Sequence, residues 1–220
     1  MIDAGQVALT LYDYPRSSAA YRVRIALNFK QLQYQSRRIN LLESEEASDE
    51  YKSLNPQGLV PVLLVQEKGK SDVVLTQSLA ICEYLQELQP DPSIMTETVF
   101  GRARIRSLAQ LICSDIHPLD NLRVLNYLED ELAADKEVKL RWYQHWIKVG
   151  FEALEQRLQE SDTGYYCHQD QVSLADICLI PQVYNAKRFD CDLSPYPKIV
   201  EITERCNQHP AFVKTQPENM

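Results

Sequence analysis

The sequence lacks any apolar run long enough to cross a bilayer, and its cysteines form no C-x-x-C pair. A membrane-spanning helix needs roughly 20 consecutive apolar residues, and no stretch approaches that length. The N-terminus, M-I-D-A-G-Q, has neither a basic region nor a long apolar core, so no signal peptide is expected. These absences argue against a membrane protein and against thioredoxin-type disulfide exchange, which requires a reactive cysteine.

The chain has fewer basic than acidic residues, 23 against 31, and carries a net charge of -8. This balance argues against nucleic acid or an anionic membrane as a main partner, but it leaves room for a local basic pocket that holds a small anion. The six cysteines are scattered, mostly among apolar residues, which favours free thiols in a reducing cytoplasm, and no metal site is expected. They are Cys82, Cys113, Cys167, Cys178, Cys191 and Cys206.

Strand-like and helix-like segments alternate through the first 90 residues. Short β-branched runs predict strands, and Ile81, Leu85 and Leu88 share one helix face. The order βαβαββα predicts a small α/β domain with a mixed sheet over residues 1–90. We expect strands at 8–12, 34–41, 60–65 and 73–75, helices at 18–30, 48–54 and 79–88, and a hairpin turn at 67–70.

The composition changes at Pro90-Asp91-Pro92-Ser93, which suits a connection between domains. Beyond it no convincing strand is found, so residues 91–220 are predicted to form an all-α domain. Apolar residues from Ile105 to Ile116 follow helical spacing, and Pro118 should end or kink that helix. A second long amphipathic helix is centred on Trp142 and Trp146.

A further helix start is marked by Ser173-Leu174-Ala175-Asp176. Ser173 can cap the helix while the Asp176 carboxylate reaches back to the Ser173 amide, which is a capping box with Asp in place of Glu. We therefore interpret Asp176 as a structural residue and not as a catalytic carboxylate.

The stretch Arg16-Ser17-Ser18 falls where the first strand hands over to the first helix. The free amides and the positive dipole end of a helix favour an anion there. A serine in this position can be a plain N-cap, or it can donate to a bound thiolate and favour its ionised form. A covalent serine nucleophile is disfavoured, because no G-x-S-x-G motif accompanies it.

Two later turns carry polar groups that one small fold could bring to the same ligand. In N-P-Q-G-L-V-P-V, a cis Val60–Pro61 bond would turn the Val60 backbone toward the start of the first helix. In T-Q-S-L-A-I, Gln77 and Ser78 offer polar atoms to a carboxylate, and Ser78 can also cap the following helix. Each motif alone is weak, and together they indicate a site for a peptide-like ligand.

Five motifs, taken together, resemble the zeta class of glutathione transferases, whose best-known members are maleylacetoacetate isomerases. The likeness runs from about Ala8 to Phe212. It implies a thioredoxin-like N-terminal domain, a helical C-terminal domain, glutathione as cofactor and usually a homodimer. The motifs are S-S-x-x-x-R-V-R-I-A-L, N-P-x-x-x-V-P, Q-S-L-A-I-x-E-Y-L, H-P-L-x-N-L-x-V-L and S-L-A-D-I-C-L-I-P-Q-V-Y-N-A-K-R-F.

The resemblance also implies roles for individual residues. Ser17 matches the serine that bonds the glutathione sulfur, with Ser18 beside it, and the Val60 backbone would pair with the cysteinyl part. Arg16 and Arg188 match arginines expected to hold substrate carboxylates. The remaining expected ligand-lining residues are Gln77 and Ser78 for the γ-glutamyl end, and His117, Asn121 and Arg123 from the helical domain.

One departure from the family concerns the first turn, which commonly reads S-S-C-S-W-R, whereas this chain has Ala19 in place of the cysteine. A role that needs a protein thiol at this position is therefore impossible. A second departure is Leu122, close to where related maleylpyruvate isomerases carry an extra arginine. Both departures favour isomerisation of maleylacetoacetate over other transfers.

The expected reaction is conversion of maleylacetoacetate, a small acidic diketo acid, to fumarylacetoacetate in tyrosine and phenylalanine catabolism. The resemblance implies reversible addition of the glutathione thiolate to the cis double bond. The alternatives are a transferase or 2-haloacid dehalogenase of the same class, a maleylpyruvate isomerase and, least favoured, a non-enzymatic binding module that keeps the transferase fold.

Overall fold

The computed structural model describes residues 7–160 and 163–220, and the chain divides into two compact units. The first unit runs to Ser93 and also contains His209–Met220, while the second is Ile94–Gln208. The predicted boundary instead lies after residue 90, with the C-terminal residues in the second domain. They group with the first unit because α9 (Pro210–Val213) packs against α1 (Ser18–Phe29), and Arg24 donates to the Thr215 carbonyl at 3.4 Å.

A four-stranded mixed sheet forms the centre of the first unit. Its strands are β1 (Val7–Asp13), β2 (Gln35–Arg38), β3 (Val62–Glu67) and β4 (Val73–Thr76), in the order β2-β1-β3-β4. Strand β1 pairs in parallel with β2 and antiparallel with β3, and β3 pairs antiparallel with β4. The hairpin between β3 and β4 turns where predicted, with Gly69 at a φ of +82°.

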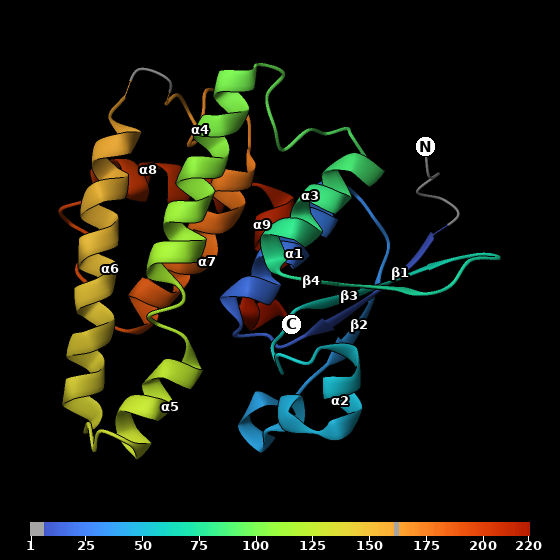
Figure 1. The fold of residues 1–220 in the computed structure, drawn as a ribbon. Coiled ribbons are helices and arrows are strands. Elements are labelled where there is room, and N and C mark those ends of the chain that lie inside the picture. Colours follow the sequence, from blue (N-terminus) through green and yellow to red (C-terminus); the bar gives the residue numbers. More distant parts are fainter. Residues whose placement is uncertain (1–6, 161–162) are drawn as a thin grey trace. The chain divides into compact units, whose positions relative to one another are not determined.

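Helices cover both faces of this sheet. Helices α1 and α3 (Ser78–Leu88) lie on one face and pack together, while α2 (Asp49–Leu54) lies on the other (Figure 1). This arrangement confirms the predicted thioredoxin-like order βαβαββα. Single 3-10 turns at Leu41–Glu43, Glu45–Ala47 and Pro217–Asn219 complete the unit.

The second unit is built from helices, as predicted. They are α4 (Val99–Gln110), a π-helical turn at Leu111–Ile116, α5 (Leu122–Asp130), α6 (Lys136–Leu158), α7 (Leu174–Arg188) and α8 (Pro197–Cys206). In the described part of this unit the only β-pairing is an isolated bridge between Thr163 and Gln169. Helices α4, α6 and α7 run alongside one another (Figure 1), and α7 is buried along most of its length.

The predicted helix boundaries in this unit have identifiable causes. The π-helical turn after α4 ends at Ile116, two residues before Pro118, as expected. At the start of α7, the Asp176 carboxylate accepts from the backbone amide and the hydroxyl of Ser173, at 2.8 and 2.7 Å, and from the Cys167 amide at 2.8 Å. All of these bonds are buried, which confirms the capping box and the structural interpretation of Asp176.

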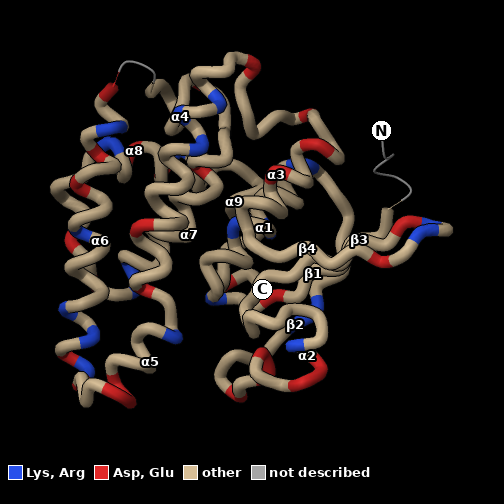
Figure 2. Tube along the Cα trace, viewed as in Figure 1, with Lys and Arg blue, Asp and Glu red and all other residues tan. Residues whose placement is uncertain are grey.

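The exposed face of α6 carries charges of both signs (Figure 2). Arg141 pairs with Glu137 at 2.6 Å and Lys148 with Glu152 at 3.8 Å, both one helical turn apart. Such exposed pairs stabilise a helix by only about 0.3–0.5 kcal/mol each. Among the described residues, no helix is both long enough and apolar enough to span a membrane.

Candidate functional site

Three turns of the first unit meet at one end of its sheet. Tyr12 of β1 lies opposite Val62 of β3, and Val62 lies opposite Thr76 of β4. These pairings bring the end of β1, the start of β3 and the end of β4 to the same end of the sheet. The three segments that continue from these points therefore leave the sheet together. They carry the predicted residues of the glutathione-binding half of the site, namely Ser17 and Ser18, Val60, and Gln77 and Ser78.

Ser17 is the N-cap of α1. Its Oγ accepts from the Ala20 amide at 3.2 Å, and its own amide donates to the Tyr14 carbonyl at 2.9 Å. The hydroxyl is half-buried and its proton is not used by the cap, so it can still donate to a ligand. Ser18 behind it is buried, whereas Arg16 is exposed.

The loop before β3 presents Val60 in a fixed conformation. The Val60–Pro61 peptide is cis. One residue earlier, the Leu59 carbonyl accepts from Tyr51 Oη and from Asn55 Nδ2, both at 2.8 Å. Gly58 has a φ of +60°, and a Cβ there would lie 2.9 Å from the Glu46 carbonyl oxygen. Only glycine fits this position without strain.

The third turn places Gln77 and Ser78 at the start of α3. Gln77 has a positive φ of 67° and makes no side-chain cap to the helix. Its amide nitrogen instead donates to Gln57 Oε1 at 2.9 Å, across to the loop that carries Val60. Ser78 is buried, and its Oγ accepts from Arg22 Nη1 at 3.2 Å.

The predicted residues of the helical unit fall at two places. His117 and Asn121 flank the segment between the π-helical turn and α5, and Arg123 is exposed in the first turn of α5. Asn121 is the N-cap of α5, because its side-chain oxygen accepts from the Arg123 amide at 3.1 Å. Arg188 is exposed near the C-terminus of α7, with its guanidinium 5.3 Å from the Phe189 ring centroid.

A buried carboxyl, Asp120, lies among these residues. Neither of its oxygens has a hydrogen-bond partner among the described residues. Burial raises the pKa of Asp120 to about 8, so the group is largely protonated at neutral pH. Its negative form also raises the pKa values of Tyr143 and Cys191, although burial is the larger cause for both.

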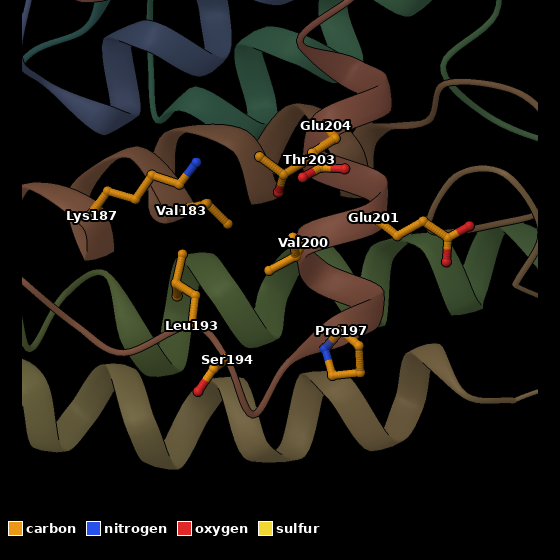
Figure 3. A pocket seen from close by; sticks show the side chains of 9 residues that line it. All are labelled: Val183, Lys187, Leu193, Ser194, Pro197, Val200, Glu201, Thr203 and Glu204. Carbon is orange, nitrogen blue, oxygen red and sulfur yellow. The ribbon is translucent and has the colours of Figure 1, made fainter.

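A groove of about 560 Å³ opens between α7 and α8 (Figure 3). Apolar side chains, among them Val183, Leu193 and Val200, line its floor, with Lys187 and Glu201 at its margin. None of the predicted site residues lines this groove, and it does not resemble a pocket for a charged peptide.

The sequence motifs did not predict a role for Arg22, Arg24 or Asp120. Arg22 and Arg24 lie in the run R-V-R-I-A-L, where they are the two charged residues of a continuously buried stretch of α1. Arg24 donates to the Tyr14 and Pro15 carbonyls at 3.3 and 2.8 Å and so holds the chain just before Ser17. Charged residues inside an otherwise apolar helical run are the signal that could have found them.

Comparison with known proteins gives consistent matches along nearly the whole chain. The family model for the glutathione S-transferase N-terminal domain matches residues 7–87. A probable maleylacetoacetate isomerase of Vibrio cholerae is 48% identical over 215 residues, which cover 97% of each chain.

Two solved structures extend this likeness to three dimensions. A holo maleylpyruvate isomerase, described as a bacterial zeta-class glutathione S-transferase, is 39% identical with a TM-score of 0.90, covering 96% of this chain and 98% of that one. A maleylacetoacetate isomerase from Methylobacterium extorquens AM1 with bound malonate and glutathione is 35% identical with a TM-score of 0.91, covering 96% and 97%. The chain therefore belongs to the zeta-class glutathione transferases, the family that includes the maleylacetoacetate isomerases.

Proposed function

We propose that this protein is a glutathione-dependent cis–trans isomerase that converts maleylacetoacetate to fumarylacetoacetate in tyrosine and phenylalanine catabolism. The observation that carries the proposal is that the turns carrying Ser17, Val60 and Ser78 leave the sheet at the same end. Membership of the family that includes the maleylacetoacetate isomerases supports the choice of reaction.

The residues of the first unit fit glutathione. The tripeptide carries a thiol, a peptide backbone and a γ-glutamyl end with a free carboxylate. Ser17 would donate to the sulfur, the Val60 backbone would pair with the cysteinyl part, and Gln77 with Ser78 would hold the γ-glutamyl end. The buried guanidinium of Arg22, which has unused donors beside Ser78, matches the negative charge of that end.

The chemistry follows from this arrangement. Bound glutathione supplies a thiolate that adds reversibly to the cis double bond, so that the bond can rotate before the thiolate leaves. Ser17 favours the ionised thiol, because its hydroxyl and the N-terminal dipole of α1 both stabilise negative charge. No protein thiol is needed at the turn, which is consistent with Ala19 at the position of the family cysteine.

Arginine side chains would position the acidic substrate. We assign Arg188 and Arg16 to its carboxylates, because both guanidinium groups are exposed and Arg188 has no ion pair among the described residues. A cation close to the developing enolate would also lower the barrier to addition. His117, Asn121 and Arg123 are proposed to line the ligand, with Asn121 acting mainly through the start of α5.

A homodimer in the cytoplasm is the proposed state of the enzyme. Val99 and Phe100 at the start of α4 are 77% and 74% exposed, and Val73 is exposed on the edge strand β4. The exposed pair Val99 and Phe100 supports an interface at this end of α4, because protein interfaces cover adjacent apolar side chains of this kind. All six cysteines are free, as is usual for a reducing compartment.

Maleylpyruvate isomerisation is the second candidate, because a maleylpyruvate isomerase of the zeta class has a TM-score of 0.90 with this chain. The two reactions share the thiolate chemistry and differ only in the length of the substrate.

Turnover of four substrates separates the candidate functions. Maleylacetoacetate, maleylpyruvate, chlorodinitrobenzene and dichloroacetate are each supplied with glutathione. We expect the highest kcat/KM for maleylacetoacetate, and faster turnover of either halogenated compound would overturn the isomerase assignment. Arg188→Ala should raise KM for maleylacetoacetate, whereas Lys187→Ala, which removes the neighbouring charge on the margin of the α7–α8 groove, should not.

A further inference from the structure

Arg22 is a buried cation with almost no partners. The side chain is 2% exposed, and its single hydrogen bond to another side chain runs from Nη1 to Ser78 Oγ at 3.2 Å. Nε and Nη2 are buried and make no hydrogen bond to any described residue. A guanidinium has five N–H donors, so most of its hydrogen-bonding capacity is unused.

Two other buried cations of the same unit, Arg24 and Lys30, each donate hydrogen bonds to several oxygens. Arg24 donates to the Asp13 carboxylate and to three carbonyl oxygens. Lys30 donates to four oxygens at and beyond the C-terminal end of α3. An uncompensated buried charge costs several kcal/mol, and for Arg22 no carboxylate of the described chain offsets that cost.

The position of Arg22 shows where a compensating anion would bind. Nη1 is directed at Ser78, the first residue of α3, and the residue before it gives that helix no side-chain cap. The amides of the first turn of α3 are therefore left for a ligand, and the positive end of the helix dipole favours an anion there. Two independent sources of positive potential thus coincide at Ser78.

The hydrogen bond also fixes what the Ser78 hydroxyl can do. Because Ser78 Oγ accepts from a cation, its own proton is directed away from Arg22 and is free for donation. A donor polarised by a neighbouring cation makes a stronger hydrogen bond in a site of low dielectric.

We propose that Arg22 is a positioning residue that sets the affinity and selectivity of this site for a ligand carboxylate, acting through the Ser78 hydroxyl. In the proposed function that carboxylate is the α-carboxylate of the γ-glutamyl residue of glutathione, and the inference rests on that function. Arg22 supplies the charge, Ser78 makes the contact, and α3 adds its free amides.

The test compares two ligands by calorimetry, with no substrate turnover involved. One is glutathione, and the other is glutathione with its γ-glutamyl α-carboxylate converted to the amide. Wild-type protein should bind glutathione at least about tenfold more tightly, which corresponds to ~1.4 kcal/mol. In Arg22→Met this preference should fall below about twofold, and Arg22→Lys should restore part of it because the charge is kept.

Controls separate this role from a purely structural one. Lys30→Met removes a buried cation near the other end of α3 and should leave the ligand preference unchanged. The double variant Arg22→Met, Ser78→Ala should lower the preference for glutathione over its amide no further than Ser78→Ala alone. The two effects are not additive, because Arg22 acts through the Ser78 hydroxyl. If Arg22→Met does not fold, Arg22→Gln serves as the neutral variant.

The outcomes are distinct. A wild-type protein that binds both ligands equally, or a folded neutral variant that keeps the full preference, overturns the role of Arg22. A wild-type protein that binds neither ligand overturns the proposed function itself.

Discussion

Arg24 and Asp13 form a buried ion pair beneath the turn that carries Ser17, with Nη1 2.6 Å from Oδ1 and side chains that are 0% and 2% exposed. Asp13 is the last residue of β1, and Arg24 lies two turns into α1. The same guanidinium holds the Pro15 carbonyl at 2.8 Å. The strand, the turn and the helix are thus tied at one point, which fixes where Ser17 lies.

Removing one partner of this ion pair should strongly destabilise the fold. Arg24→Met leaves the Asp13 carboxylate buried without its cation, and we expect the free energy of unfolding to fall by about 3–5 kcal/mol. KM for glutathione should rise as well, because the carbonyls of the turn lose their donor. Urea unfolding and initial rates measure the two effects, and a stability loss below about 1 kcal/mol would contradict the structural role.

Ser17→Ala tests the hydroxyl at the thiol-binding turn, with Ser48→Ala as a matched control. Both serines cap a helix through a 3.2 Å bond to an amide of the first turn. Each substitution should therefore cost about 1 kcal/mol of stability. Only Ser17→Ala should raise the pKa of bound glutathione, seen in its ultraviolet thiolate absorbance, and lower kcat/KM by about tenfold or more. Equal activity of the two variants would reduce Ser17 to a plain cap.

The hydrogen bonds to the Leu59 carbonyl predict how strongly two substitutions should destabilise the loop that carries Val60. Tyr51→Phe removes one of its two donors and should cost about 1 kcal/mol of stability. Asn55→Ala should cost more, because Asn55 Oδ1 also accepts from the Gln57 amide at 3.1 Å. KM for glutathione should follow the same order in initial-rate measurements. A larger effect of Tyr51→Phe on both quantities would contradict this assignment.

Asp120 should make stability depend on pH. Its pKa is raised by burial from 3.8 to about 8, so the folded state binds a proton that the unfolded state has released. The stabilisation is complete below about pH 4 and is lost as the pH rises through about 8, with a slope of up to about 1.4 kcal/mol per pH unit. Asp120→Asn keeps the shape and should remove this slope. Urea titrations measure the free energy of unfolding of both proteins from pH 5 to 8. A difference between the two that stays constant over this range would refute the role of Asp120.

Hydrophobic periodicity and turn chemistry predicted much of this molecule. Alternating segments predicted the order of elements in the first unit, and the Ser173–Asp176 spacing predicted the capping box. These features are local, because each depends on residues within a few positions of one another. The meeting of the three turns at one end of the sheet is not local, because it follows from the pairing of β1 with β3 and of β3 with β4.

The rest could not be predicted, because it depends on residues far apart in the sequence. Arg22 contacts a residue 56 positions away, and Arg24 one 191 positions away. Hydropathy places such charges at the surface, whereas here the helix is enclosed on all sides. The polar edge strand β2 is likewise shorter than predicted, because Asn40 caps the 3-10 turn that follows it.

The central claim is that the thiol of bound glutathione, and not a protein side chain, performs the isomerisation. It is tested most directly by following the conversion of maleylacetoacetate with glutathione, with S-methylglutathione and with neither. The account predicts turnover only when glutathione is present. S-methylglutathione should inhibit competitively with glutathione, because it binds the same turns but has no free thiol. Conversion at an undiminished rate without glutathione, or with the blocked thiol, would contradict it.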